Sequence, residues 1–178
     1  MYVASLDKYV KKAKTMGMDK AKIIDPNTVV VGHWVRLKCQ FGCSGYGRHL
    51  TCPPFSPTPE QTKKMLAEYS KGLLMQIENI SLARESRISS KLKKIVADLE
   101  RQIFLDGYYK AFGMGSGPCW FCRVCNTTKL CKYPERVRPS MEACGIDVYK
   151  TCHNNGFKLE VVRTEDQPCS YVGLILIE

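Results

Sequence analysis

The sequence predicts an α/β domain, in which a mixed sheet with flanking helices carries a cysteine-rich iron–sulfur lobe. Three observations lead to this fold class. The chain of 178 residues, 44% hydrophobic and 25% charged, is long and apolar enough to bury a core. Segments with helical and β-strand patterns alternate along it. Its ten cysteines are concentrated in a few short stretches. We therefore predict a single domain over residues 1–178, with a cysteine-rich metal-binding insertion at 113–153.

The first elements are read from periodicity and turn signals. Residues 5–16 place apolar side chains on one stripe with lysines opposite, which predicts an amphipathic helix. Asp25-Pro26-Asn27 predicts a turn, and residues 28–31 and 34–37 are rich in β-forming side chains. We therefore expect a strand to lead directly to Cys39.

The next segment begins with a strong helix signal. Thr58 can cap a helix, Pro59 suits its first position, and Gln61 stands where a capping box needs it. After this helix, Gly72 opens an apolar run over 73–77 that predicts a buried strand. Strand, helix and strand in this order predict a right-handed βαβ unit. The loop from Cys39 to Cys52 would then lie at the carboxyl end of a strand, where open α/β sheets place their sites.

The longest helix is expected to begin at Ser89 or Ser90 and to run to about Phe112, ending at the main cysteine motif. A helix C-terminus facing an anionic metal cluster is unfavourable, so the glycine-rich turn at 113–117 should redirect the chain first. The remaining elements are expected to be short helices at 140–144 and 148–153 and strands at 157–162 and 170–177.

The main cysteine motif spans Cys119, Cys122, Cys125 and Cys131, in the pattern C-x2-C-x2-C-x5-C. Two-residue spacers let successive thiolates converge on one compact group. The pattern is close to the C-x2-C-x2-C-x3-C-P run of bacterial ferredoxins, which holds [4Fe–4S] clusters. Its last gap is longer, and Pro134 does not follow the fourth cysteine directly. We predict that this motif binds a [4Fe–4S] cluster. One alternative is zinc, although zinc sites normally use two separated C-x2-C pairs. The other alternative is disulfides or free thiols.

A second group of cysteines follows the expected first strand. Cys39, Cys43 and Cys52 lie in a stretch rich in glycine and proline, spaced C-x3-C-x8-C. Radical-SAM enzymes use C-x3-C-x2-C, which would need a cysteine at position 46, where Tyr46 stands. We predict that these three cysteines ligate a second metal group, the alternative being packed or singly reactive thiols.

Other candidate ligands carry weaker signals. Cys144 is a candidate fourth ligand of the second group, or else a small buried apolar side chain. Cys152 and Cys169 stand outside the motif spacing and are expected to be structural or free. His33 and His49 are expected to make ordinary hydrogen bonds, and His49 is the nearer candidate if an iron lacks a cysteine.

Composition restricts the partners. The start of the chain lacks the apolar segment of a secretory signal, and no apolar run approaches the ~20 residues that span a bilayer. We expect a cytoplasmic protein without membrane partners, in which clustered cysteines serve metal or redox chemistry. The formal charge of +10 counts cysteines as neutral. Two clusters, each carrying about −2, would reduce it to about +6, and no nucleic-acid motif accompanies the basic residues.

Three classes of function remain open from the residues alone. The first is electron transfer or redox service to a partner enzyme. The second is a cluster-dependent enzyme in sulfur or cofactor chemistry, which predicts a pocket beside an open iron, faced by Tyr46, Arg48 or His49, and a small-molecule substrate. The third is a zinc-stabilised binding module. Neither a Walker A motif nor a dinucleotide fingerprint occurs in the sequence.

The chain also resembles a known family of predicted metal-binding proteins of unknown function from anaerobic bacteria and archaea. The likeness covers the chain from about Val35 onward and rests on the segments RLKCQFGC (36–43), TCPPFSPT (51–58), GYYKAF (107–112), GPC (117–119) and RPSMEACGID (138–147). It implies that eight cysteines belong to the family pattern: Cys39, Cys43, Cys52, Cys119, Cys122, Cys125, Cys131 and Cys144. The resemblance implies metal binding and gives no reaction.

Overall fold

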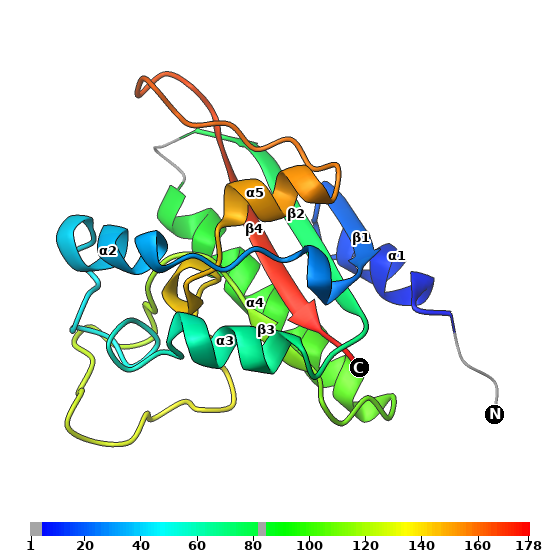
Figure 1. The fold of residues 1–178 in the computed structure, drawn as a ribbon, viewed down its shortest axis with the longest axis horizontal. Coiled ribbons are helices and arrows are strands. Elements are labelled where there is room, and N and C mark those ends of the chain that lie inside the picture. The colour runs from blue at the N-terminus through cyan, green and yellow to red at the C-terminus, as the bar shows by residue number, and fades with distance from the viewer. Residues whose placement is uncertain (1–4, 82–84) are drawn as a thin grey trace.

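A computed structural model describes residues 5–81 and 85–178, in which helices pack on both faces of a four-stranded sheet (Figure 1). The strands are β1 (Lys20–Ile24), β2 (Gly72–Ile80), β3 (Phe112–Met114) and β4 (Cys169–Leu176), in the order β1-β2-β4-β3. The α-helices are α1 (Asp7–Thr15), α2 (His33–Gly42), α3 (Pro59–Leu66), α4 (Glu85–Leu105) and α5 (Val148–Asn154). Short 3-10 helices occupy Pro26–Thr28 (η1) and Glu142–Cys144 (η3).

The α/β class with flanking helices is confirmed, but the predicted βαβ unit is wrong. Strand β2 pairs antiparallel with both β1 and β4, and β3 pairs antiparallel with β4. The segment 34–37, expected to be the first strand of that unit, lies inside α2. Helical spacing puts Val35 and Cys39 on one face, which packs against η3, and this tertiary contact overrides the β-forming character of the residues.

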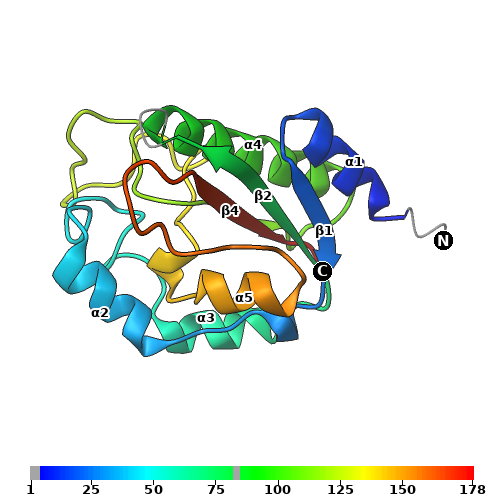
Figure 2. The same cartoon turned by 90° about the horizontal axis from the view of Figure 1, so that it is seen from above.

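The sheet separates two apolar cores, and Figure 2 shows the resulting layers. On one face, α1 and α4 pack on alternate residues of β2 such as Leu73 and Met75. On the other face, Leu74 packs with residues of α3, α5 and η3. Because both faces of β2 are covered, its sequence is a continuous apolar run, as predicted for a buried strand.

Several element boundaries follow the local signals. Thr58 and Gln61 form the predicted capping box of α3, with Pro59 at the first turn. The predicted helices near 140–144 and 148–153 appear as η3 and α5, and Asp147 caps α5 by accepting the Lys150 N–H at 2.9 Å. The predicted last strand is confirmed as β4.

Other expectations are wrong. Helix α4 begins at Glu85, before the serines expected to cap it, and it ends at Leu105, because the segment up to Phe112 turns back toward the sheet. The predicted strand at 157–162 has no ladder partner among the described residues, and this segment runs as an extended connection. Strands β1 and β3 were not predicted from the sequence; both are short.

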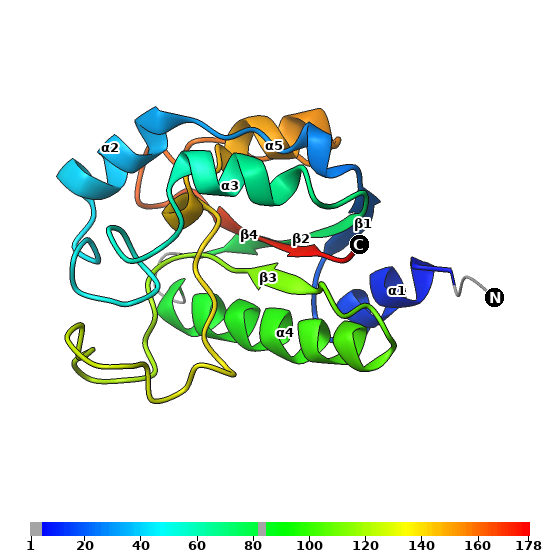
Figure 3. The same ribbon diagram turned by 60° about the horizontal axis from the view of Figure 1, so that its bottom comes forward.

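The turn after α4 determines where the cysteine motif lies. Strand β3 runs back along α4, so residues 116–118 reach the N-terminal half of this helix (Figure 3). Ser89 donates a hydrogen bond to the Ser116 carbonyl at 3.2 Å, and Lys93 donates one to the carbonyl of Pro118. The chain is thus redirected before it reaches the motif, as expected, although the redirection begins already after Leu105 and not at residues 113–117. The start of the motif lies instead beside the N-terminal half of the helix.

Within residues 5–81 and 85–178, no helix has both the length and the apolar character needed to cross a bilayer.

Candidate metal centre

The main cysteine motif lies on a loop with little regular structure, fixed at both ends. At its start, Gly115 forms an isolated bridge with Ser140, and at its end Arg138 is bound to Glu100 of α4 by an ion pair of 2.6 Å. All ten cysteines of the sequence lie in the described part of the chain, and each is a free thiol. The loop is thus held by the fold without a disulfide.

Backbone amides of this loop point to its sulfur atoms. The Tyr133 N–H donates to Cys131 Sγ at 3.4 Å, and the Phe121 N–H donates to Cys119. In each case the amide lies two residues after the cysteine. An N–H donor stabilises a thiolate more than a neutral thiol, so this geometry suits cysteines that bind metal in the anionic form.

The thiols of this loop also interact electrostatically. Burial is the largest effect and raises the pKa of Cys119, and the nearby thiols of Cys131 and Cys125 raise it further. Cys122 is half-buried on the same loop. The loop therefore brings the thiols of Cys125 and Cys131 within electrostatic range of Cys119. Lys93 is also within range and lowers the Cys119 pKa.

The second cysteine group lies at the end of α2. Cys39 belongs to its last turns, and Cys43 directly follows the helix and accepts the Gly45 N–H at 3.4 Å. This repeats the amide-to-sulfur contact of the first loop. Burial is the main cause that raises the pKa of Cys52 to about 11, and the thiols of Cys43 and Cys39 act in the same direction. The three predicted ligands of this group thus lie together.

Gly45 is where the two groups meet. A Cβ atom at this position would lie 3.4 Å from Cys52 Sγ, 3.5 Å from Cys43 Sγ and 3.2 Å from the Cβ of Pro118. Pro118 directly precedes Cys119, so the loop after α2 packs against the start of the main motif. The absence of a side chain at Gly45 permits this close approach.

Lys93 of α4 lies between the two groups. It is 8% exposed, and among the described lysines it is the buried one. Burial lowers its pKa, while Cys119, Cys52 and Glu142 raise it, so thiols of both groups lie within its electrostatic range. A buried cation at this point stabilises thiolates and any anionic group that they bind.

A cavity of about 890 Å³ opens beside the second group. Cys39, Cys43 and Cys52 contribute to its wall, together with aromatic side chains from distant segments: Trp34, Tyr46, Trp120, Tyr149 and Tyr171. The buried Glu142 Oε2 and Ser116 Oγ have no hydrogen-bond partner within the described part of the chain, and both residues line this cavity. Burial raises the pKa of Glu142.

The remaining candidates have different surroundings. Cys144 is fully buried in the apolar core between the sheet and α3, and burial raises its pKa to about 12; its role as a ligand stays a prediction. Cys152 is buried in the same core, and Cys169 donates to the Ile80 carbonyl at 3.3 Å.

The two candidate histidines contact other side chains. His33 pairs with Glu60 at 2.9 Å on the surface, and His49 packs edge-on against Trp120, with ring centroids 6.0 Å apart. In the part of the chain that the structure describes, no group of three or more His, Cys, Asp or Glu side chains is arranged so that it could hold a metal ion.

Comparison with known proteins assigns the chain to a described family. Residues 22–177 match the family described as predicted metal-binding protein (DUF2284). The chain belongs to this family. The match covers nearly the whole sequence, including both cysteine groups, and so confirms the resemblance found from the sequence motifs. No curated protein and no solved structure matches the chain.

For this member of the DUF2284 family, sequence reasoning missed three residues that lie beside the two cysteine groups: Lys93, Glu142 and Arg36. Lys93 is a charged residue three positions before the core residue Val96, on the buried side of α4, whereas Glu142 is partly buried in the short η3 and has no such pattern around it. A charge on the apolar side of the helix was the available signal for Lys93. Arg36 donates to Ser56 Oγ at 2.8 Å and to the Ala143 carbonyl at 2.6 Å, which ties α2 to η3. Only the folded structure shows this contact.

Proposed function

We propose that the chain binds [4Fe–4S] clusters and acts as an electron carrier that serves a partner enzyme. Cys119, Cys122, Cys125 and Cys131 would hold one cluster. Cys39, Cys43 and Cys52, with Cys144 or a ligand from outside the chain, would hold a second. When bound, such clusters accept and donate single electrons.

The observation that carries this proposal is the position of Lys93 between two groups of cysteines. A redox group gains negative charge on reduction, and a buried cation in range of both groups stabilises that charge. The amides directed at Cys43, Cys119 and Cys131 act in the same sense. A structural zinc site does not need a buried cation to stabilise added negative charge, because the charge of zinc does not change.

The chain itself offers further support for redox service. The two cysteine groups meet at Gly45, so two bound groups would be close neighbours, as electron transfer between them requires. Aromatic rings border the site: Phe121 packs on Tyr133 with centroids 5.8 Å apart, and Trp120 packs on His49. Such rings limit the access of water, which influences the reduction potential of a bound cluster.

The test is purification without oxygen, followed by iron, sulfide and zinc analysis with absorption and EPR spectra. We expect iron and sulfide in equal amounts and a chromophore that dithionite bleaches. The Cys122→Ala variant should lose about one cluster's iron, while the matched Cys169→Ala variant should keep the full content. A colourless protein that contains zinc would refute the proposal and favour a zinc-stabilised binding module. Equal iron losses in both variants would refute the assignment of ligands.

A second candidate function is favoured by the cavity beside Cys39, Cys43 and Cys52. Of the three residues expected to face such a pocket, Tyr46 lines it. Glu142 Oε2 and Ser116 Oγ, both buried, have no hydrogen-bond partner in the described structure and are available to a bound molecule. A cluster with an open iron in this position would act as a Lewis acid toward a small substrate, as in sulfur or cofactor chemistry.

The two candidates differ in the iron of the second group. An open iron site gives an EPR signal that changes when cyanide is added to the reduced protein, and Cys144→Ala leaves the iron content unchanged. A fully ligated electron carrier gives no cyanide response. Loss of iron in Cys144→Ala would identify Cys144 as the fourth ligand and exclude the open-site enzyme.

A further inference from the structure

The main cysteine loop exposes large apolar side chains around its thiols. Val124 is 83% exposed and Leu130 is 95% exposed, and both stand directly beside predicted ligands in the sequence. Trp120, Phe121 and Tyr133 are also exposed on this loop. We call these five residues, with the cations described next, the loop surface. Apolar side chains so exposed are typical of interaction sites.

The loop surface is also basic. Its exposed cations are Arg123, Lys129, Lys132 and Arg136, and the acidic residue among them is Glu135, whose carboxylate lies 3.8 Å from Arg136. In Figure 3 the loop projects at one end of the molecule, away from α1. The partner that complements this surface must therefore carry negative charge.

A hollow of about 430 Å³ lies at the edge of the loop surface, between the loop and α4. Lys93, Lys94 and Arg136 contribute cations to its lining, and the rings of Trp120 and Phe121 form another part of the wall. Asp98 is the one acidic residue among the lining side chains. Lys94 and Arg136 are exposed, whereas Lys93 is buried and donates to the Pro118 carbonyl. Two exposed cations beside two aromatic rings suit a carboxylate side chain on an apolar stem.

We propose that the loop surface is the docking site for an acidic redox protein, with an acidic side chain of that partner in the hollow. This inference rests on the proposed function, since it names the class of partner with which electrons are exchanged. Val124, Leu130, Trp120 and Phe121 each stand within one residue of a predicted ligand. A partner seated on them would bring its redox group close to a cluster held by the same loop.

The composition of the loop surface favours a protein over nucleic acid. Single-stranded nucleic acid binds through aromatic rings on which bases stack. Here Phe121 already packs on Tyr133, Trp120 packs on His49, and the most exposed apolar residues are the aliphatic Val124 and Leu130. Aliphatic side chains ringed by charges are typical of a protein interface, with its apolar centre and polar rim.

The test measures electron transfer from the reduced, cluster-loaded protein to an acidic plant-type [2Fe–2S] ferredoxin by stopped flow. At low salt the second-order rate constant should be high, and it should fall at least tenfold at 0.5 M salt. The double variant R123E/K129E should lower the rate constant about tenfold at low salt and weaken its salt dependence. The matched control K11E/K12E on α1 makes the same change in net charge away from the loop and should stay within twofold of the native chain.

Two further measurements sharpen the result. With a basic cytochrome c in place of the ferredoxin, R123E/K129E should raise the rate constant, because the sign of the charge interaction is reversed. V124S/L130S should lower the rate with ferredoxin while its salt dependence persists. Iron content and absorption spectra must match the native protein for each variant, which separates docking from loss of the cluster.

The outcomes distinguish this inference from the function on which it rests. A preparation without redox-active iron overturns both. A loaded protein whose transfer to ferredoxin shows no salt dependence, or in which K11E/K12E lowers the rate as much as R123E/K129E, overturns the docking site alone. Tighter, loop-dependent binding to single-stranded RNA or to anionic vesicles than to ferredoxin would overturn it as well.

Discussion

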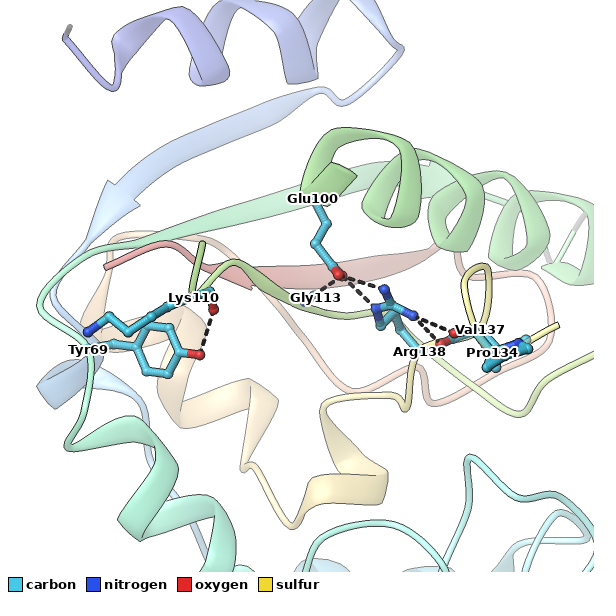
Figure 4. A network of polar contacts seen from close by, with 7 residues as sticks. All are labelled: Tyr69, Glu100, Lys110, Gly113, Pro134, Val137 and Arg138. Atoms are coloured by element: carbon cyan, nitrogen blue, oxygen red, sulfur yellow. Dashed lines mark hydrogen bonds and ion pairs between the residues drawn. The ribbon is translucent and has the colours of Figure 1, made fainter. Parts of the chain in front are cut away.

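Arg138 donates hydrogen bonds of 2.6 Å to both carboxylate oxygens of Glu100, Oε1 and Oε2 (Figure 4). Glu100 Oε2 also accepts a hydrogen bond of 2.8 Å from the Gly113 N–H. The pair is largely buried, with side chains 19% and 9% exposed. It joins the end of the main cysteine loop to α4 and to β3. The carboxylate thus fixes the residues on both sides of the predicted cluster ligands.

Arg138→Met should lower the free energy of unfolding by about 3 kcal/mol, because it leaves a carboxylate buried without its cation. Urea unfolding of the metal-free protein measures this. The double variant Glu100→Gln/Arg138→Met should recover part of the loss, since no uncompensated charge remains. The pair would not be the source of the effect if the double variant lost more free energy of unfolding than Glu100→Gln and Arg138→Met lose together as single variants.

Gly113→Ala should also destabilise the fold, by about 1–3 kcal/mol. A Cβ here would lie 2.5 Å from Val96 Cγ1 and 2.8 Å from Glu100 Oε2, so both the core and the ion pair must shift. Gly42→Ala is the matched control, because a Cβ at Gly42, the last residue of α2, would meet nothing within 4 Å. We expect Gly42→Ala to leave thermal stability unchanged or slightly raised; a comparable loss in both variants would contradict the steric argument.

Asp106 should make stability depend on pH in the acid range. Hydrogen bonds from Lys8, Tyr9 and Gln102 lower the pKa of this carboxyl to about 2, against about 4 in an unfolded chain. A lowered pKa in the folded state stabilises the fold above about pH 4, and this contribution disappears as the pH falls toward 2.

Because the Asp106 cluster lies near the surface, its contribution is about 1 kcal/mol. Urea unfolding of the native chain and of Asp106→Asn should therefore differ by about this amount at pH 7 and converge near pH 2. A difference that stays constant from pH 7 to pH 2 would rule out the carboxylate as its cause.

Lys93→Met should weaken metal binding and lower the reduction potential of the loaded protein. Removing a buried cation in range of both cysteine groups disfavours the reduced state, which carries more negative charge. The reduction potential should therefore fall by about tens of millivolts. Potentiometric EPR titration measures the shift, and iron analysis measures retention. Lys91→Met removes an exposed lysine from the same helix and should change neither quantity; equal shifts in the two variants would assign the effect to net charge alone.

Local signals predicted the parts of the fold that depend on local interactions. Thr58 and Gln61 determine the start of α3, and the apolar run after Gly72 is strand β2. The topology was missed because it depends on distant contacts. Trp34 and Val35 are β-forming residues, yet the packing of α2 on η3 makes them helical. Phe112 continues the apolar pattern of α4, but it pairs with Leu176 as part of β3.

The candidate site shows the same division. Cysteine spacing predicted two groups, and the structure brings Cys39 and Cys43 near Cys52, and Cys125 and Cys131 near Cys119; their role as ligands stays a prediction. It did not indicate that Gly45 and Pro118 join the two groups, or that Lys93 lies between them, because these contacts link segments far apart in the sequence. The family to which the chain belongs is described as predicted metal-binding protein, which agrees with the metal binding expected from the cysteines.

The contact of Gly45 with Pro118 has a consequence for how the protein matures. During synthesis, Cys39, Cys43 and Cys52 leave the ribosome well before Pro118 and Cys119. The contact between Gly45 and Pro118 can therefore form only after the later segment has been made. We therefore expect the proposed metal groups to be inserted only after the tertiary structure has closed, and a nascent chain stalled before Pro118 should carry its early thiols unprotected.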